Sequence, residues 1–139
     1  LVNVDLLNLS PVVGNINLPD GTYQEVELKL AFKKSSTAIP LTLKGVYTNN
    51  TGAKIPVEFY LNEDIAIKAE AEDIEIKAND HMGFINLQLN KLLTNLSQSD
   101  LGSASQTNGV IVISSTSNMD IYNKIKANVN TFSDCDFDN

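Results

Sequence analysis

The chain has 139 residues, 42% of them hydrophobic and 19% charged, which is enough to bury the core of one domain without disulfides or metal ions. Ten lysines and no arginine stand against seventeen acidic residues, so the net charge is -7. Nucleic-acid binding depends on clustered cations and favours arginine, and this composition therefore argues against a nucleic-acid partner.

The first two-thirds of the chain is predicted to consist mainly of strands. From Tyr23 to Lys34, apolar and polar residues alternate, which indicates a strand with one face in the core. The same period of two continues in residues 41–47, 55–61 and 65–76. The last of these segments is also rich in helix-forming Ala, Glu and Lys. A strand is favoured because its isoleucine pairs are spaced by two, and a helix would scatter them over too wide an arc.

Two short helices are predicted in the C-terminal half. The first follows a short strand, and the second can begin at a cap formed by Ser117 or Asn118. The apolar stripes of the two helices consist of Leu89, Leu92, Leu93 and Leu96, and of Tyr122, Ile125, Val129 and Phe132.

Between these helices, residues 97–109 are rich in Ser, Gln, Asn and Gly, which predicts an exposed, flexible loop. Residues 110–113 read as a short buried strand, and residues 133–139 form an acidic tail. We therefore expect a single domain over residues 1–139 that is mainly β. The expected architecture is an antiparallel β-sandwich, prealbumin-like or immunoglobulin-like, with two short helices in its C-terminal half.

Two N-terminal segments carry a family resemblance. Residues 4–9 read VDLLNL, and residues 18–28 read LPDGTYQEVEL. This pattern resembles a functionally uncharacterised family of exported bacterial domains, often lipoproteins, which combine a D-L-L-x-L stretch with an L-P-x-G-x-Y turn and an amphipathic strand. The resemblance implies secretion and a place in the cell envelope or at the outer membrane surface, with membrane contact only through a lipid anchor outside this chain. It implies no catalytic residues.

The residues most often used in catalysis are scarce. The one histidine, His81, could act as a base or a metal ligand, but it lies in a run of turn-forming residues where an exposed turn is the simpler interpretation. The one cysteine, Cys135, is flanked by Asp134 and Asp136, and their carboxylates disfavour the reactive thiolate. Zinc sites need three or four nitrogen or sulfur ligands, which is more than one histidine and one cysteine supply, so a zinc site is not expected either. We therefore expect no enzyme.

Carboxylate pairs could in principle serve a glycosidase. The candidates alternate with apolar residues along predicted strands, so we interpret them as the solvated face of a sheet. They are Glu25 with Glu27, Glu58 with Glu63, and the set Glu70, Glu72, Asp73 and Glu75.

The acidic tail offers the one candidate metal site. Asp134, Asp136 and Asp138 are spaced by two and supply the hard oxygen ligands that calcium takes, although no glycine turn or distal glutamate follows them. An acidic, frayed terminus is the alternative interpretation. No glycine-rich phosphate loop is present, so no cofactor other than calcium is expected.

These observations predict a non-enzymatic extracytoplasmic domain of a bacterial envelope lipoprotein, a binding or structural module. One alternative is a carbohydrate-binding module, in which Tyr47 and Tyr60, together with Tyr23, would present aromatic rings to a sugar. The other is an adhesin-like or pilus-like assembly subunit that binds by strand addition at an open sheet edge. The expected partner is accordingly a glycan or an envelope protein.

Overall fold

The computed structural model describes residues 4, 5, 7, 14, 16–77, 83–131 and 133–137. Its strands are β1 (Gly21–Phe32), β2 (Leu41–Thr48), β3 (Lys54–Leu61), β4 (Ile65–Ile76), β5 (Gly83–Leu87), β6 (Gln106–Thr107), β7 (Val110–Ile113) and β8 (Ser133–Phe137). Its helices are α1 (Leu89–Leu92), α2 (Gln98–Gly102) and α3 (Met119–Ala127). The predicted mainly β fold with short helices in the C-terminal half is confirmed. None of the helices in the described ranges is long and apolar enough to cross a membrane.

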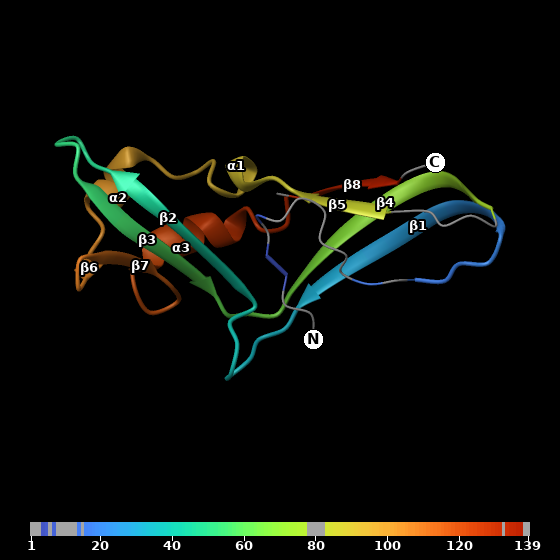
Figure 1. Ribbon diagram of the computed structural model, residues 1–139, viewed down its shortest axis with the longest axis horizontal. Coiled ribbons are helices and arrows are strands. Elements are labelled where there is room, and N and C mark those ends of the chain that lie inside the picture. The colour runs from blue at the N-terminus through green and yellow to red at the C-terminus, as the bar shows by residue number, and fades with distance from the viewer. Residues whose placement is uncertain are drawn as a thin grey trace.

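The described strands form three sheets, and the molecule is elongated (Figure 1). At one end, a four-stranded sheet in the order β2-β3-β7-β6 packs against α3, and we call this end the helix half. At the other end, the two-stranded ribbon β1-β4 lies beside the ribbon β5-β8 in a sandwich-like arrangement, and we call this end the ribbon half. The pairings are antiparallel except that of β3 with β7, which is parallel.

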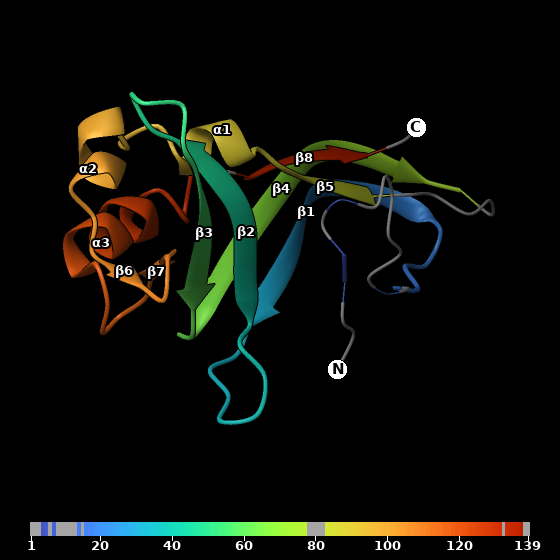
Figure 2. The ribbon, with the colours of Figure 1, turned by 60° about the vertical axis from the view of Figure 1, so that its left-hand side comes forward.

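Residues 21–76 form one long hairpin that is bent in the middle (Figure 2). The outer part pairs β1 with β4, and the inner part pairs β2 with β3. Between the two parts, residues 33–40 on one side of the hairpin stand opposite residues 62–64 on the other. This unequal insertion, which we call the joint, turns the inner part away from the outer part.

Side chains of the shorter segment hold the joint together. The Asn62 side chain accepts the Ser35 N–H at 3.0 Å and donates to the Ser35 carbonyl at 2.9 Å. Asp64 accepts the Lys34 N–H at 2.7 Å. These contacts satisfy backbone groups that the interrupted ladder leaves without a strand partner.

The preference for strand over helix in residues 65–76 is confirmed, because this segment is β4. Ile67 and Ile74 are both buried although an odd number of positions separates them, which strict alternation forbids. Asp73, with φ at 54°, lies between them in the left-handed region and shifts the alternation by one residue.

The larger hydrophobic core is centred on the helix half and continues across the joint to Ile67 of β4. The second predicted helix is confirmed as α3, and its stripe residues Tyr122, Ile125 and Val129 are buried, whereas Phe132 lies outside the described residues. The ring of Tyr122 packs on Phe59 of β3 with a centroid distance of 5.9 Å. The remaining members of this core include Leu41, Leu61, Ile67, Leu92, Ile111 and Ile113.

The region between β5 and α3 departs from prediction in two ways. The first helix is shorter than expected, because α1 ends at Leu92 and Leu93 is 42% exposed. The segment 97–109, predicted to be a loop, is largely exposed but contains α2 and β6. Asn118 occupies the cap position of α3, but its side chain binds the backbone of Ser105 and Val112 and does not cap the helix.

Candidate functional site

The candidate site lies on the face of the four-stranded sheet that points away from α3. Glu58 and Tyr60 are two positions apart on β3 and therefore share a face, and Lys44 is the cross-strand partner of Glu58 on β2. Phe59, between them, points to the opposite face and into the core. Strand alternation and register thus bring together a cation, a carboxylate and an aromatic ring, which we call the Lys44 triad (Lys44, Glu58, Tyr60).

The Lys44 triad is joined through both carboxylate oxygens of Glu58. The Lys44 ammonium lies 3.2 Å from Glu58 Oε1, and the Tyr60 hydroxyl donates to Glu58 Oε2. These hydrogen bonds lower the pKa of Glu58, and the same contacts with Glu58 raise the pKa values of Tyr60 and Lys44. At neutral pH the cluster therefore carries a protonated amine, an ionised carboxylate and a neutral phenol.

This arrangement suits recognition of polar ligands. The ring of Tyr60 is half-buried, so part of it is open to solvent, and it lies beside a charged donor and a charged acceptor. An aromatic face packs against apolar C–H surface, and the ammonium can donate to hydroxyl groups. Each Glu58 oxygen accepts one bond within the triad and has a second lone pair that can accept another.

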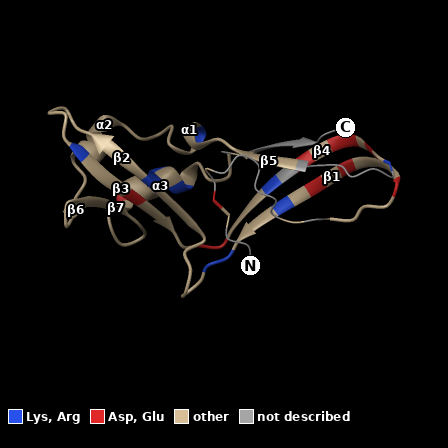
Figure 3. Cartoon of the chain, in the orientation of Figure 1, with Lys and Arg blue, Asp and Glu red and all other residues tan. Residues whose placement is uncertain are grey.

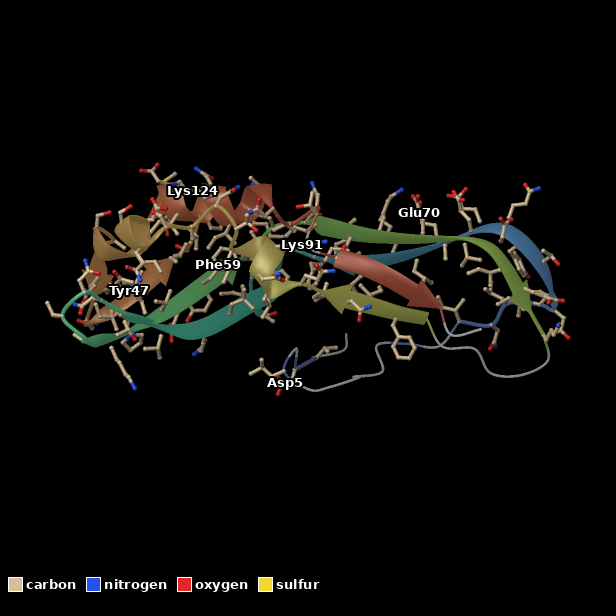
Figure 4. The ribbon with its side chains drawn as sticks, turned by 90° about the horizontal axis from the view of Figure 1, so that it is seen from above. Asp5, Tyr47, Phe59, Glu70, Lys91 and Lys124 are labelled. Atoms are coloured by element: carbon tan, nitrogen blue, oxygen red, sulfur yellow. The ribbon has the colours of Figure 1, made fainter. Side chains whose placement is uncertain are left out.

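The other tyrosines predicted for a sugar platform do not join Tyr60. Tyr47 is 8% exposed and its hydroxyl donates to the Gln98 carbonyl at 3.2 Å, so the expectation that it presents its ring to a ligand is wrong. Figure 4 shows Tyr47 and Phe59 at the end of the molecule that holds α3. Tyr23 lies on β1, and its hydroxyl donates to the Pro19 carbonyl at 2.8 Å.

The predicted calcium ligands fall at the edge of what the structure describes. Asp134 and Asp136 belong to β8, opposite Asn86 and Phe84 of β5, so their backbone is an extended strand. The positions of their carboxylates, and all of Asp138, lie outside the described part of the chain, and calcium binding here stays a prediction. Among the described residues, no group of three or more His, Cys, Asp or Glu side chains could hold a metal ion.

The side chains of the two residues considered for catalysis both lie outside the described part of the chain. His81 lies outside the described residues. Cys135 is in β8 opposite Ile85, and its side chain is not among those described.

Most carboxylate pairs lie on a solvated strand face, as interpreted from the sequence. Glu25 is the cross-strand partner of Glu72, and Glu27 is the partner of Glu70, all on the exposed side of the β1-β4 ribbon. Figure 3 shows this acidic part of the ribbon at the end distant from the four-stranded sheet. Lys68 forms an ion pair with Glu27 at 2.9 Å.

Glu63 differs from those pairs, because it fixes α3 to the joint. It accepts a hydrogen bond from the Tyr122 hydroxyl and forms an ion pair with Lys126. The contact with Lys126, followed by that with Tyr122, lowers the pKa of Glu63, while burial and the bond to Glu63 raise the pKa of Tyr122. The sequence analysis grouped Glu63 with Glu58 and did not predict this role, because Glu63 and Tyr122 are 59 positions apart in the chain.

A shallow pocket between α2 and α3 was also missed. The capping box of α2 places Asp100 at its wall, where the carboxylate binds Ser97 and lies 2.7 Å from the Lys124 ammonium. The Lys124 contact is the main cause that lowers the pKa of Asp100 to about 2. The spacing Ser97-x-x-Asp100 matches a capping box and could have predicted the start of this helix. The pocket's strongest acceptor is thus already occupied by the protein's own groups.

Comparison of the chain with models of protein families, with curated proteins and with solved structures finds no match. The site is therefore interpreted from its own residues and contacts.

Proposed function

We propose that this chain is a non-enzymatic, extracytoplasmic module of a bacterial envelope lipoprotein, and that it binds glycan through the outer face of its four-stranded sheet. The observation that carries the binding proposal is the Lys44 triad, which joins a half-buried aromatic ring to a charged donor and a charged acceptor on one sheet face. The envelope location rests on the resemblance of residues 4–28 to exported bacterial domains.

Four carboxyl groups of the described residues do not fit the role of a general acid. The pKa values of Glu58, Glu63, Asp64 and Asp100 are all lowered by hydrogen bonds and nearby lysines. A carboxyl that serves as a general acid near neutral pH needs the opposite, a raised pKa. These four groups are suited to accept hydrogen bonds from a ligand or from the protein itself.

The test is glycan binding by the purified chain, with isolated peptidoglycan sacculi and soluble envelope polysaccharides as probes. We expect co-sedimentation or calorimetry to detect binding, and Tyr60→Ala to weaken it at least about tenfold because the stacking surface is lost. Tyr60→Phe keeps the ring and should retain most of the affinity. Thr107→Ala, on the exposed two-residue strand β6, is the matched control and should bind as the native chain does.

Two outcomes would contradict the proposal. One is the absence of binding to every probe by a folded chain. The other is binding that Tyr60→Ala leaves unchanged, since the ligand would then contact a different surface.

A further inference from the structure

The edge strand β2 is long and regular. The eight residues Leu41–Thr48 are all in register with β3, and no described strand pairs with the other side of β2. The opposite edge of the same sheet, β6, has two residues. A strand at a sheet edge presents a row of backbone N–H and C=O groups that can pair with a further strand. The loop 33–40 projects beyond the Leu41 end of β2 and does not run along the strand (Figure 2).

The usual obstacles to strand pairing are weak along β2. Natural edge strands are protected by Pro, by bulges or by charged side chains. β2 has no proline, and its ladder with β3 runs without interruption. Its one charged residue, Lys44, is paired with Glu58, and Val46 is 64% exposed. The edge therefore leaves apolar surface and backbone groups open to solvent.

The middle of β2 also has free space on the core-facing side. Gly45 shares this side with Leu43 and Tyr47, and a Cβ placed on Gly45 would meet no heavy atom of the described structure within 4 Å. Glycine within a strand often marks a place where another backbone approaches closely.

We propose that β2 pairs with β2 of a second copy of this chain, antiparallel and with the two-fold axis at Gly45. The two four-stranded sheets then join into one continuous sheet, in an isologous interface. The inference goes beyond the proposed function, because it concerns pairing at the edge of the sheet; Lys44 belongs both to this edge and to the Lys44 triad, whereas Tyr60 is on β3, one strand inward. An assembly subunit is expected to bind by strand addition, and this inference names a second copy of the chain as the partner.

The register follows from three requirements. Core-facing residues must oppose core-facing residues, because a shift of one position exposes the apolar side chains. An axis at Lys44 would set the two Lys44 side chains directly opposite each other, which is unfavourable. With an axis at Val46, only residues 44–48 of the two copies would face each other. An axis at Gly45 overlaps residues 42–48 and brings no like charges together.

The cross-strand pairs produced by the Gly45 axis are complementary. Thr42 stands opposite Thr48 of the second copy, and Leu43 stands opposite its Tyr47. Threonine pairs and pairs of aromatic with aliphatic side chains are favourable between antiparallel strands. Lys44 stands opposite the exposed Val46, whose side chain the aliphatic stem of the lysine can cover.

The distribution of charge also favours this edge. The net charge of -7 makes two copies repel each other. Glu25, Glu27, Glu70 and Glu72 are concentrated in the ribbon half, away from β2 (Figure 3). Screening by salt limits repulsion between charges farther apart than about 10 Å. Association through β2 therefore keeps the strongest acidic surfaces apart.

The first test is sedimentation equilibrium of the full chain over a wide concentration range. We expect a monomer–dimer equilibrium, and Val46→Lys should raise its dissociation constant at least about tenfold because each added lysine faces Lys44 of the other copy. Thr107→Lys adds the same charge at the opposite edge and should leave the dimer unchanged. Tyr60→Ala should also leave it unchanged, which separates this inference from the proposed glycan site. A chain that stays monomeric up to roughly 1 mM would overturn the inference.

The second test is disulfide trapping in a Cys135→Ser background. Gly45→Cys places a thiol opposite its own counterpart across the axis, within the Cα spacing that a disulfide accepts. It should form a covalent dimer under mild oxidation much faster than Thr48→Cys, whose thiol would face Thr42. Equal rates of cross-linking for the two variants, or a dimer that Val46→Lys does not weaken, would place the contact elsewhere and refute the register.

Discussion

The helix half and the ribbon half share one bent hairpin but bury their side chains to different extents. In the helix half, α3 covers the sheet, and residues such as Leu61, Ile111 and Ile125 are nearly inaccessible to solvent. In the ribbon half, the separate cluster of buried residues consists of Val26, Ile74 and Ile76. The same alternating pattern thus produces unequal burial, because the burial depends on what packs against the apolar face.

The largest expected effect tests this difference directly. Leu61→Ala removes a side chain that is 0% exposed, and we expect it to lower the free energy of unfolding by about 2–5 kcal/mol. Ile76→Ala, in the smaller cluster, should cost about 1–2 kcal/mol, because a loosely surrounded site can collapse around the deletion. Urea denaturation measures both values. Equal losses would mean that the small cluster packs as tightly as the large core.

A second prediction concerns the joint between the halves. Asn62→Ala removes both hydrogen bonds to the Ser35 backbone, and we expect a loss of about 1–3 kcal/mol, because part-buried backbone groups are left unsatisfied. Asn95→Ala is the control, because it removes a hydrogen bond between two side chains, from Asn95 to Asn128, that is exposed to solvent. Thermal unfolding compares the two variants. A loss no larger than that of Asn95→Ala would show that the joint does not depend on Asn62.

Local patterns in the sequence predicted β1 to β5, β7 and α3, because residues within one element follow a fixed period. They did not predict β6, which lies in the segment expected to be a loop, or β8, which lies in the expected acidic tail. The alternation from Tyr23 onward and the stripe of Tyr122, Ile125 and Val129 each needed only neighbouring residues. The same rule, applied to Tyr47, would have placed it with Leu41 and Leu43 in the core. Treating it as a ligand-binding residue overlooked its position in the alternation.

Long-range features could not be predicted from local sequence patterns. The parallel pairing of β3 with β7 and the contact of Glu63 with α3 join segments far apart in the chain, and no local period encodes them. The shift of alternation at Asp73 was visible as an odd spacing between Ile67 and Ile74, but its structural cause, a left-handed residue inside a strand, needed the backbone. The Lys44 triad depended on register, which the turn and both strands fix together.

A third prediction uses pH to examine the contact between α2 and α3. The pKa of Asp100 is lowered to about 2, below its ordinary value near 3.8, so its contribution to stability is present above about pH 4 and is lost as the pH falls toward 2. Asp100→Asn should therefore lower the melting temperature by a few degrees at pH 7, and this difference should shrink between pH 4 and pH 2. Carbon NMR of the Asp100 carboxyl gives an independent titration. A midpoint near 4 would contradict the prediction.

The smallest expected effect belongs to the exposed face of the ribbon half. Glu25 and Glu72 are direct cross-strand partners, and like charges in that position are destabilising. Glu72→Lys converts the repulsion to an attraction and should raise the free energy of unfolding by about 0.2–1 kcal/mol, with Glu72→Gln between the native chain and the lysine variant. The gain should diminish in high salt, since both side chains are exposed. A gain that salt leaves unchanged would have another origin than charge. A gain that follows salt would mean that this ribbon retains acidic pairs at a cost to its stability, while the helix half uses its carboxylates Glu63 and Asp100 in contacts with α3.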